Sequence, residues 1–176
     1  MKKRGHMLAA ALVLSGIATL LVAAAPESSD KETQKGLERA RNTVRMLDDV
    51  YKTTIVLITD KYVHTETDFP AGSAAVQLFA AINKKGWHNV RLIDATGAPY
   101  KDTNVAQDDF EKEGVKQLKA GKDYYEKVVE ENGKRYLRAI TPVPVVMQKC
   151  VMCHPHYEDA KQGEPIGAIT YKMPID

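Results

Sequence analysis

The chain has 176 residues and a formal net charge of +2 at pH 7, with 27% charged and 44% hydrophobic residues. It has no basic stripe with interleaved aromatic residues, which argues against a nucleic-acid-binding protein. The length suffices for one domain with its own core, and no internal repeat or low-complexity tract suggests another organisation.

The N-terminal segment is typical of a bacterial export signal, because basic residues at positions 2–4 precede an apolar run over 7–25 that ends in small residues. It predicts a periplasmic protein. Cleavage after Ala24 is favoured over cleavage after Ala25, since Pro26 follows the latter. Removal of residues 1–25 takes away three positive charges and no negative ones, so the net charge moves from +2 to −1. An uncleaved run of about 19 residues would instead anchor the chain in a membrane.

A polar linker is expected over 26–36, and a long amphipathic helix over Lys31–His64, because apolar residues there recur at spacings of three and four. Such a helix would be about 50 Å long, longer than a small domain is wide. One end must therefore overhang, pack against a partner or run toward the membrane. The expected core face carries Leu37, Ala40, Val44, Leu47, Tyr51, Thr54, Ile58 and Tyr62, and a second face carries Met46, Val50, Thr53, Leu57 and His64.

The remaining elements predict an α+β fold, in which helices lie beside one antiparallel sheet. Phe69–Gly72 breaks the first helix, and Asn132-Gly133 between two alternating segments is a strong hairpin signal. The sequence predicts a helix over 74–83 capped by Ser73, a strand over 88–95, a helix from 108 to 120, strands over 124–129 and 135–143, and a last strand over 166–173.

The segment Cys150-Val151-Met152-Cys153-His154 spells C-x-x-C-H and contains both cysteines of the chain. This spacing is typical of the attachment site of a c-type haem. Each thiol can add to one vinyl group of the porphyrin, and His154 then supplies the proximal iron ligand. The motif precedes the last strand, whereas small helical cytochromes c carry it near their N-terminus.

Three other interpretations of the two cysteines compete with haem. A structural disulfide across two residues is strained and easily reduced. A redox-active dithiol is expected near a β-α-β pattern, which is absent around the motif. A structural zinc site needs four ligands, which His154 and His156 could complete only in a cramped geometry. A disulfide would leave a haem-free ligand-binding module, and the purified protein would be colourless.

In this order along the chain, several segments resemble a family of periplasmic haem-c proteins with a PAS-like fold. They are Phe69–Ser73, Val90–Leu92, Tyr100–Asn104, Asp109–Glu111, Tyr136–Ala139, Pro142–Val145, Lys149–Pro155 and Gly163–Ala168. The resemblance covers about residues 37–176 and implies a domain with one covalent haem. It also implies a sensor or redox role and a homodimer paired through the N-terminal helix. Some members use an N-terminal cysteine as the sixth iron ligand, which this chain lacks.

The sixth ligand is therefore sought among other side chains. Met46 lies mid-helix, and the resemblance implies that such domains can take a ligand from this helix; Met46 would otherwise be a gap-filling core residue. His64 is a second candidate. The two are 18 residues apart, or about 27 Å along a helix, so at most one reaches a given iron. The further candidates are His88, Met147 and Met173, while Met152 and His156 are discounted because they begin on the proximal side.

The two propionates of a haem need cationic partners when they are buried. Arg91 and Arg138 are expected on sheet strands, and Lys149 is adjacent to Cys150. These three side chains are the candidate propionate partners, although each would otherwise be an ordinary surface charge.

Two classes of function follow for an exported haem protein. The first is single-electron transfer with a redox partner protein, or sensing of redox state or a diatomic gas. The second is a small haem enzyme with peroxidase or nitrogen-oxide chemistry, which needs a distal acid–base group over an open iron, a role that His64 could take. No kinase, methyl-accepting or DNA-binding segment follows Asp176, so a sensor is expected to act through a partner.

Overall fold

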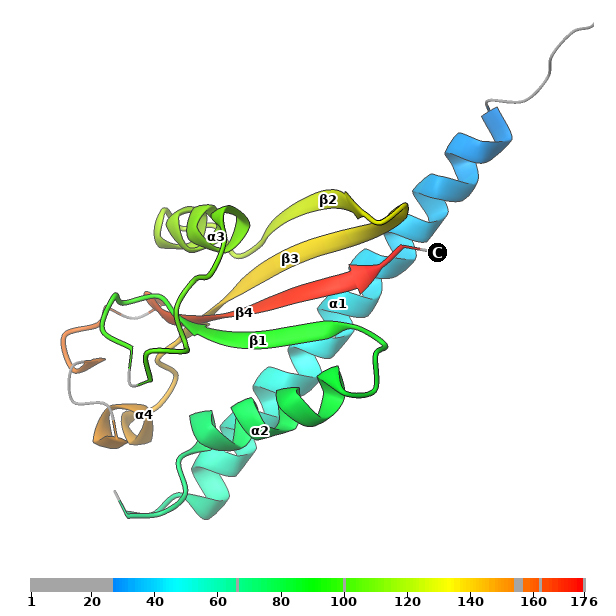
Figure 1. The fold of residues 1–176 in the computed structure, drawn as a ribbon. Helices are drawn as coiled ribbons and strands as arrows, with labels where there is room; N and C mark the ends of the chain where they lie inside the picture. Colours follow the sequence, from blue (N-terminus) through cyan, green and yellow to red (C-terminus); the bar gives the residue numbers. More distant parts are fainter. Residues whose placement is uncertain (1–26, 66, 100, 154–156, 162, 176) are drawn as a thin grey trace, which may run out of the picture.

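A four-stranded antiparallel sheet forms the centre of the computed structural model, which describes residues 27–65, 67–99, 101–153, 157–161 and 163–175 (Figure 1). The spatial order of its strands is β1-β4-β3-β2. Their bounds are β1 (Asn89–Asp94), β2 (Tyr125–Glu131), β3 (Lys134–Pro144) and β4 (Pro165–Pro174). The expected α+β class is confirmed.

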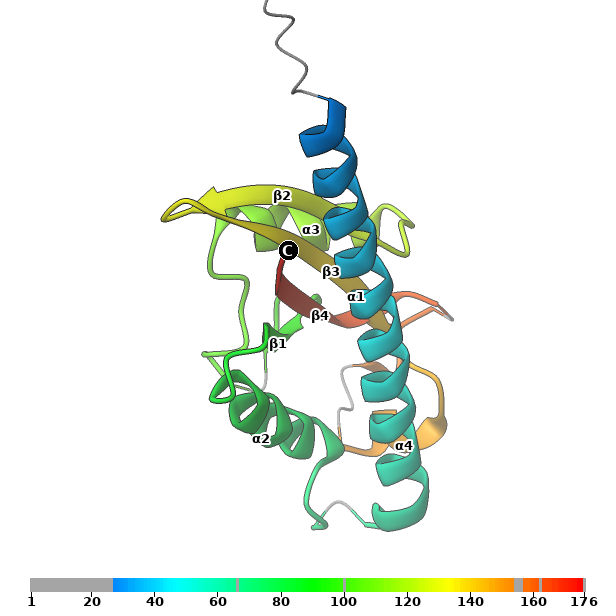
Figure 2. The ribbon, with the colours of Figure 1, turned by 90° about the vertical axis from the view of Figure 1, so that its right-hand side faces the viewer.

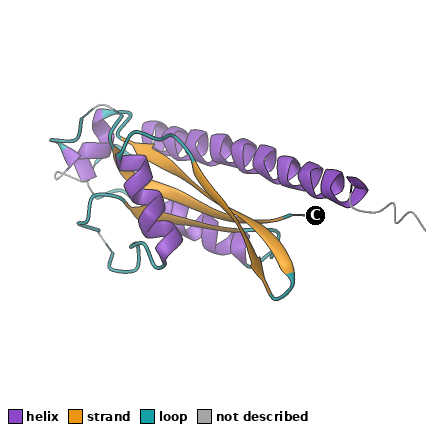
Figure 3. Cartoon of the chain, turned by 90° about the horizontal axis from the view of Figure 1, so that it is seen from above, coloured by secondary structure: helices purple, strands orange, loops and turns teal. Residues whose placement is uncertain are grey.

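The helix α1 (Glu27–Tyr62) runs along one face of this sheet (Figure 3). It has 36 residues and is therefore about 54 Å long. Its N-terminal turns project beyond the strands (Figures 1 and 2), and its first buried residues are Gly36 and Leu37. The expected overhang thus lies at the N-terminal end, and the segment expected as a linker is helical from Glu27 onward. The helix ends at Tyr62, so its expected extension to His64 is wrong.

The buried face of α1 follows the expected pattern from Leu37 to Tyr51 and then shifts. Beyond Tyr51 the buried side chain is Thr59, and Ile55 packs against the core, whereas Tyr62 is 75% exposed. A straight helix has 3.6 residues per turn, whereas alternating spacings of three and four average about 3.5. A face with these spacings therefore rotates gradually away from the core. Steps of four after Tyr51 correct this drift, which the sequence pattern did not predict.

The two faces of the sheet carry separate cores, because successive strand residues point to opposite sides. Val90, Leu137 and Tyr171 pack with α1 and α2 (Ala71–Asn83). Ile93, Ile140 and Ala168 pack with Phe110 and Leu118 of α3 (Asp109–Lys119) on the other face.

Local signals explain most element ends. Asp108 caps α3 by accepting a hydrogen bond of 2.9 Å from the Glu111 N–H, at the residue where the sequence predicts this helix to begin. Asn132 and Gly133 turn the β2–β3 hairpin with φ angles of 53° and 71°, the left-handed values that an Asn-Gly turn requires. The expected cap of α2 is wrong, because α2 begins at Ala71 after Pro70 and Ser73 lies inside it.

No helix within the described part of the chain is long and apolar enough to cross a membrane. The apolar run over 7–25 lies outside the described residues.

Candidate functional site

The C-x-x-C-H motif lies on an excursion between the two central strands of the sheet. Strands β3 and β4 stay paired down to Pro144 and Pro165, and the chain leaves the sheet between these two residues. This excursion contains the short helix α4 (Gln148–Cys153). Cys150 is half-buried on α4, and its N–H donates to the carbonyl of Met147 at 3.0 Å. His154 and His156 lie outside the described residues, as do the side chains of Met152 and Cys153.

Lys149 ties α4 to the C-terminal end of α1. Its ammonium Nζ donates a hydrogen bond of 2.6 Å to the carbonyl oxygen of Asp60. The last four carbonyls of a helix have no partner within it, and a lysine there also complements the negative end of the helix dipole. The contact places α4 beside the last turns of α1 and the segment that links α1 to α2 (Figures 1 and 2).

Large apolar side chains around this end of the molecule are exposed. They are Tyr62 on the last turn of α1, Phe69 before α2, and Val146 before α4. Exposed apolar side chains that gather in one region mark an interaction or cofactor site more often than ordinary surface. A porphyrin is a flat, mostly apolar group, so these side chains and the half-buried Cys150 thiol fit a covalent haem at α4.

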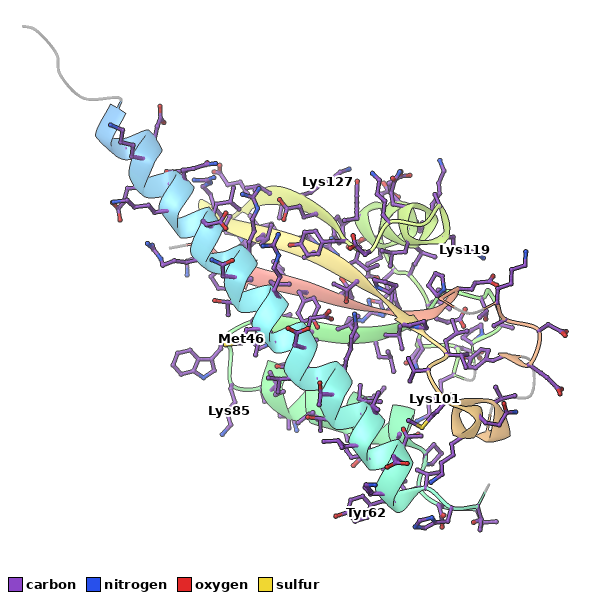
Figure 4. All side chains as sticks on the ribbon, turned by 180° about the vertical axis from the view of Figure 1, so that it is seen from behind. Met46, Tyr62, Lys85, Lys101, Lys119 and Lys127 are labelled. Atoms are coloured by element: carbon purple, nitrogen blue, oxygen red, sulfur yellow. The ribbon has the colours of Figure 1, made fainter. Side chains whose placement is uncertain are left out.

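Met46 and His64, the two candidate distal ligands, lie at very different places. Met46 is 58% exposed on the outer side of α1, near its middle, whereas Tyr62 marks the helix end (Figure 4). Fourteen residues separate Met46 from Asp60, or about 21 Å along the axis. The structure therefore does not bring Met46 to α4 of its own chain. His64 follows Asp60 by four residues, and its N–H donates to the Asp68 carboxylate at 2.7 Å.

Of the other candidate ligands, His88 and Met173 are buried in the core, and Met147 lies next to α4. His88 is buried and its Nε2 lies 3.1 Å from the Tyr51 hydroxyl. Met173 is buried in the core beside α1, near the far end of β4. Met147 is half-buried immediately before α4, so it is the one methionine with a described side chain that the structure keeps near Cys150.

Arg91 and Arg138 lie on the face of the sheet turned away from α1, because their neighbours Val90 and Leu137 fill the core beneath that helix. Arg91 donates to both carboxylate oxygens of the buried Glu111 at 2.8 Å. Arg138 pairs with Asp108 at 2.5 Å, and its guanidinium lies 4.3 Å above the Phe110 ring. Both arginines thus fasten α3 to the sheet, and of the three propionate candidates only Lys149 lies on α4.

Glu111 is a buried acid that sequence analysis did not single out. Besides the two bonds from Arg91, its carboxylate accepts a hydrogen bond of 2.8 Å from the Gln107 N–H. The sequence did contain a signal for this acid. Glu111 is the third residue after the Asp108 cap, and this spacing resembles that of a capping box. In a capping box the acid accepts a hydrogen bond from the N–H of the capping residue itself. Glu111 instead accepts one from the N–H of Gln107, the residue before the cap.

Tyr157 begins the return of the excursion from α4 toward β4. Burial, and to a lesser extent the charge of Asp94 at the end of β1, raises the pKa of the Tyr157 hydroxyl. The chain after the motif therefore comes back near the end of β1 before it enters β4 at Pro165.

Asp48 links α1 to the two central strands, a connection that sequence analysis missed. Its Oδ1 accepts hydrogen bonds from the Thr141 hydroxyl at 2.6 Å and the Tyr171 hydroxyl at 2.9 Å. Its Oδ2 pairs with Lys52 at 2.8 Å. Burial first, and then the Asp48 carboxylate, raises the pKa of Tyr171. The spacing of Asp48 and Lys52 is an available helix signal, but their place over the sheet depends on tertiary packing.

Among the residues that the structure describes, no cluster of three or more His, Cys, Asp or Glu side chains could hold a metal ion. The C-x-x-C-H motif remains the candidate site that the sequence predicts, and its His154 lies outside those residues. A comparison with curated proteins finds no match. The profile of the Tll0287-like family, however, matches residues 27–174, from the first residue of α1 to the last residue of β4. The chain therefore belongs to the Tll0287-like family.

Proposed function

We propose that this protein carries one covalent haem c and acts in single-electron transfer or in sensing redox state or a diatomic gas. The observation that carries the proposal is the C-x-x-C-H sequence on α4 and directly after it, on an excursion held at both ends by paired strands. The exposed apolar side chains around α4 support it, because a porphyrin would cover them.

Each residue of the site has a distinct role in this proposal. Cys150 and Cys153 form the thioethers, and His154 binds the iron on the proximal side. Lys149 is a positioning residue, since its bond to the Asp60 carbonyl fixes α4 against α1. When bound, the haem supplies reversible one-electron chemistry, with a potential that depends on its axial ligands and its exposure to water. Phe69 and Val146 would limit that exposure.

The distal side decides between electron transfer and gas binding, because a strong sixth ligand blocks the position that a gas would take. Within one chain, the distance of Met46 from α4 favours His64 or an open position over Met46. Arg91 and Arg138 bind acids on the opposite sheet face, so we expect the propionates to find Lys149 or water instead.

We also propose that the protein is periplasmic, exported by its N-terminal segment, and that two copies pair through α1. The outer face of α1 supports pairing, because Met46, Val50 and Leu57 are each more than half exposed. With Thr53 they follow spacings of four, three and four, which is the pattern of a helix–helix seam.

The covalent haem can be tested by mass spectrometry of the denatured protein, made in cells that attach haem to exported proteins. We expect the mass to exceed that of the polypeptide by one haem. Cys150→Ala and Cys153→Ala should each leave at most one thioether, and the double variant none. A colourless wild-type protein with a Cys150–Cys153 disulfide would contradict the proposal.

Optical spectra of the ferric, ferrous and carbon-monoxide-treated protein test the distal side. We expect Met46→Ala to leave all three spectra unchanged, because that side chain points away from the sheet. His64→Ala should change the ferric spectrum if His64 is the sixth ligand, and should leave it unchanged if the position is open. A spectral change in Met46→Ala alone would instead indicate ligation by Met46, which the length of α1 permits only from a second chain.

A further inference from the structure

A groove of about 460 Å³ opens between α1, the C-terminal end of α2 and the last residues of β4. Its walls are mainly apolar, with Leu47 from α1, Ile82 from α2 and Met173 from β4. Sites for small molecules have this size and this kind of lining, with a few polar groups that orient the ligand. The groove is therefore large enough for a small organic molecule.

The groove is remote from the C-x-x-C-H motif. Met173 lies near the end of β4, whereas the motif precedes the start of that strand at Pro165. Eight residues of strand separate these positions, or about 26 Å. The proposed haem cannot account for the groove, and a ligand there does not depend on the haem.

Trp87 stands at the rim of the groove and is 78% exposed. It is the only tryptophan of the chain. Tryptophan is usually well covered in folded proteins, and its large flat ring prefers to stack on another ring. A largely exposed indole beside an apolar concavity can stack on a planar guest.

Lys85 gives the same rim a positive charge. Its side chain is exposed, lines the groove and projects from the segment between α2 and β1 (Figure 4). In the part of the chain that the structure describes, its ammonium group has no acidic partner. The rim therefore complements an anionic group on the guest.

A buried polar pair closes the inner side of the groove. His88 and Tyr51 both line it, and their Nε2 and hydroxyl lie 3.1 Å apart. This is the one hydrogen bond that the structure describes for the His88 ring, so its Nδ1 has no protein partner among the described residues. A guest can therefore be oriented by a ring nitrogen within and by an ammonium group at the rim.

We propose that this groove binds a small planar aromatic carboxylate. The aromatic ring lies between Trp87 and the apolar wall, and the carboxylate faces Lys85. A purely apolar guest would leave the Lys85 ammonium group without an anionic partner, and an aliphatic acid would leave the indole without a stacking partner.

Isothermal titration calorimetry of the full purified protein at low salt tests this proposal, with 2-naphthoate as the probe and neutral 2-naphthamide as its matched analogue. We expect saturable binding of 2-naphthoate, about threefold tighter than that of 2-naphthamide. Trp87→Ala should weaken both probes by about fivefold, since both lose the same stacking contact. Lys85→Gln should weaken only the binding of 2-naphthoate, to the level of the amide.

Lys119→Gln and Val128→Ala serve as controls, because both residues are exposed on elements that do not line the groove. They should leave both affinities unchanged, and the melting temperature of every variant checks that it is folded. Absence of saturable 2-naphthoate binding overturns the proposal. It is also overturned if the acid and the amide bind equally well, or if Trp87→Ala binds 2-naphthoate as tightly as the wild type.

Discussion

The Asp48 carboxylate joins three elements through three hydrogen bonds, so its removal leaves donors without acceptors in the interior. Asp48→Ala would strand the Thr141 and Tyr171 hydroxyls, both of which are buried. We expect a loss of about 2–4 kcal/mol in the free energy of unfolding, because each buried unsatisfied group costs about 1–3 kcal/mol.

Urea unfolding measures this loss, and Tyr171→Phe is the matched control. That variant removes one donor and keeps the ring, so it should cost only about 1 kcal/mol. A loss below that of Tyr171→Phe in Asp48→Ala would show that water replaces the carboxylate at this position.

His88 predicts a dependence of stability on pH. Burial lowers the pKa of its imidazole below the ordinary value of 6.5. Between the two pKa values the unfolded chain binds a proton that the folded chain does not, so stability falls as pH falls. The contribution of His88 is fully present above about pH 6.5 and is lost progressively below it.

The urea midpoint of the wild type should therefore decrease between pH 7.5 and pH 5 by more than that of His88→Gln, which can still bond to Tyr51 but does not titrate. The two proteins differ only at residue 88, so the difference between their midpoints reports this side chain. Equal slopes for the two proteins would show that the folded protein accommodates a protonated His88.

The sequence predicted the ends of helices and strands well where they depend on neighbouring residues. The start of α3 and the Asn132-Gly133 turn depend on neighbouring residues alone, and both were predicted. The buried face of α1 beyond Tyr51 was predicted less well. The covered residues there are Ile55 and Thr59, which belong to neither of the two predicted faces.

The packing of α3 on β3 is close enough to require glycine. A Cβ on Gly114 would lie 2.6 Å from Cγ2 of Ile140, a branched side chain fixed in the core. Gly114→Ala should therefore lower the free energy of unfolding by about 1–3 kcal/mol, the usual cost of overpacking. This loss opposes the gain of up to about 1 kcal/mol that alanine normally gives over glycine inside a helix.

Gly72→Ala is the control, since Gly72 is also helical and nothing lies within 4 Å of its added Cβ. It should leave the urea midpoint unchanged or raise it. A neutral Gly114→Ala would mean that α3 can move away from the sheet without cost.

At the scale of the whole molecule, α1 presents a second apolar face that no part of the described chain covers. If two copies pair through this face, Val50→Lys should shift the protein toward the monomer, because it places a charge in the seam. Val128→Lys is the matched control, since Val128 is likewise exposed (42% against 53% for Val50) but lies on β2.

Light scattering at micromolar concentration measures the mass. We expect a dimer for the wild type and for Val128→Lys, and a monomer for Val50→Lys. A monomeric wild type would refute pairing and leave the exposed face of α1 without a known partner.

The sequence by itself determined the α+β class, the order of the elements, the long first helix and the C-x-x-C-H motif before the last strand. These features depend on residue spacing and local turn chemistry, which one chain displays directly. Tertiary structure alone decided which charged residues lie together. It paired Arg91 and Arg138 with acids on α3, placed Met46 on the outer side of α1 and fastened Lys149 to Asp60. The reason is that contacts between distant segments depend on which face of the sheet each helix covers, and residue spacing does not encode that choice.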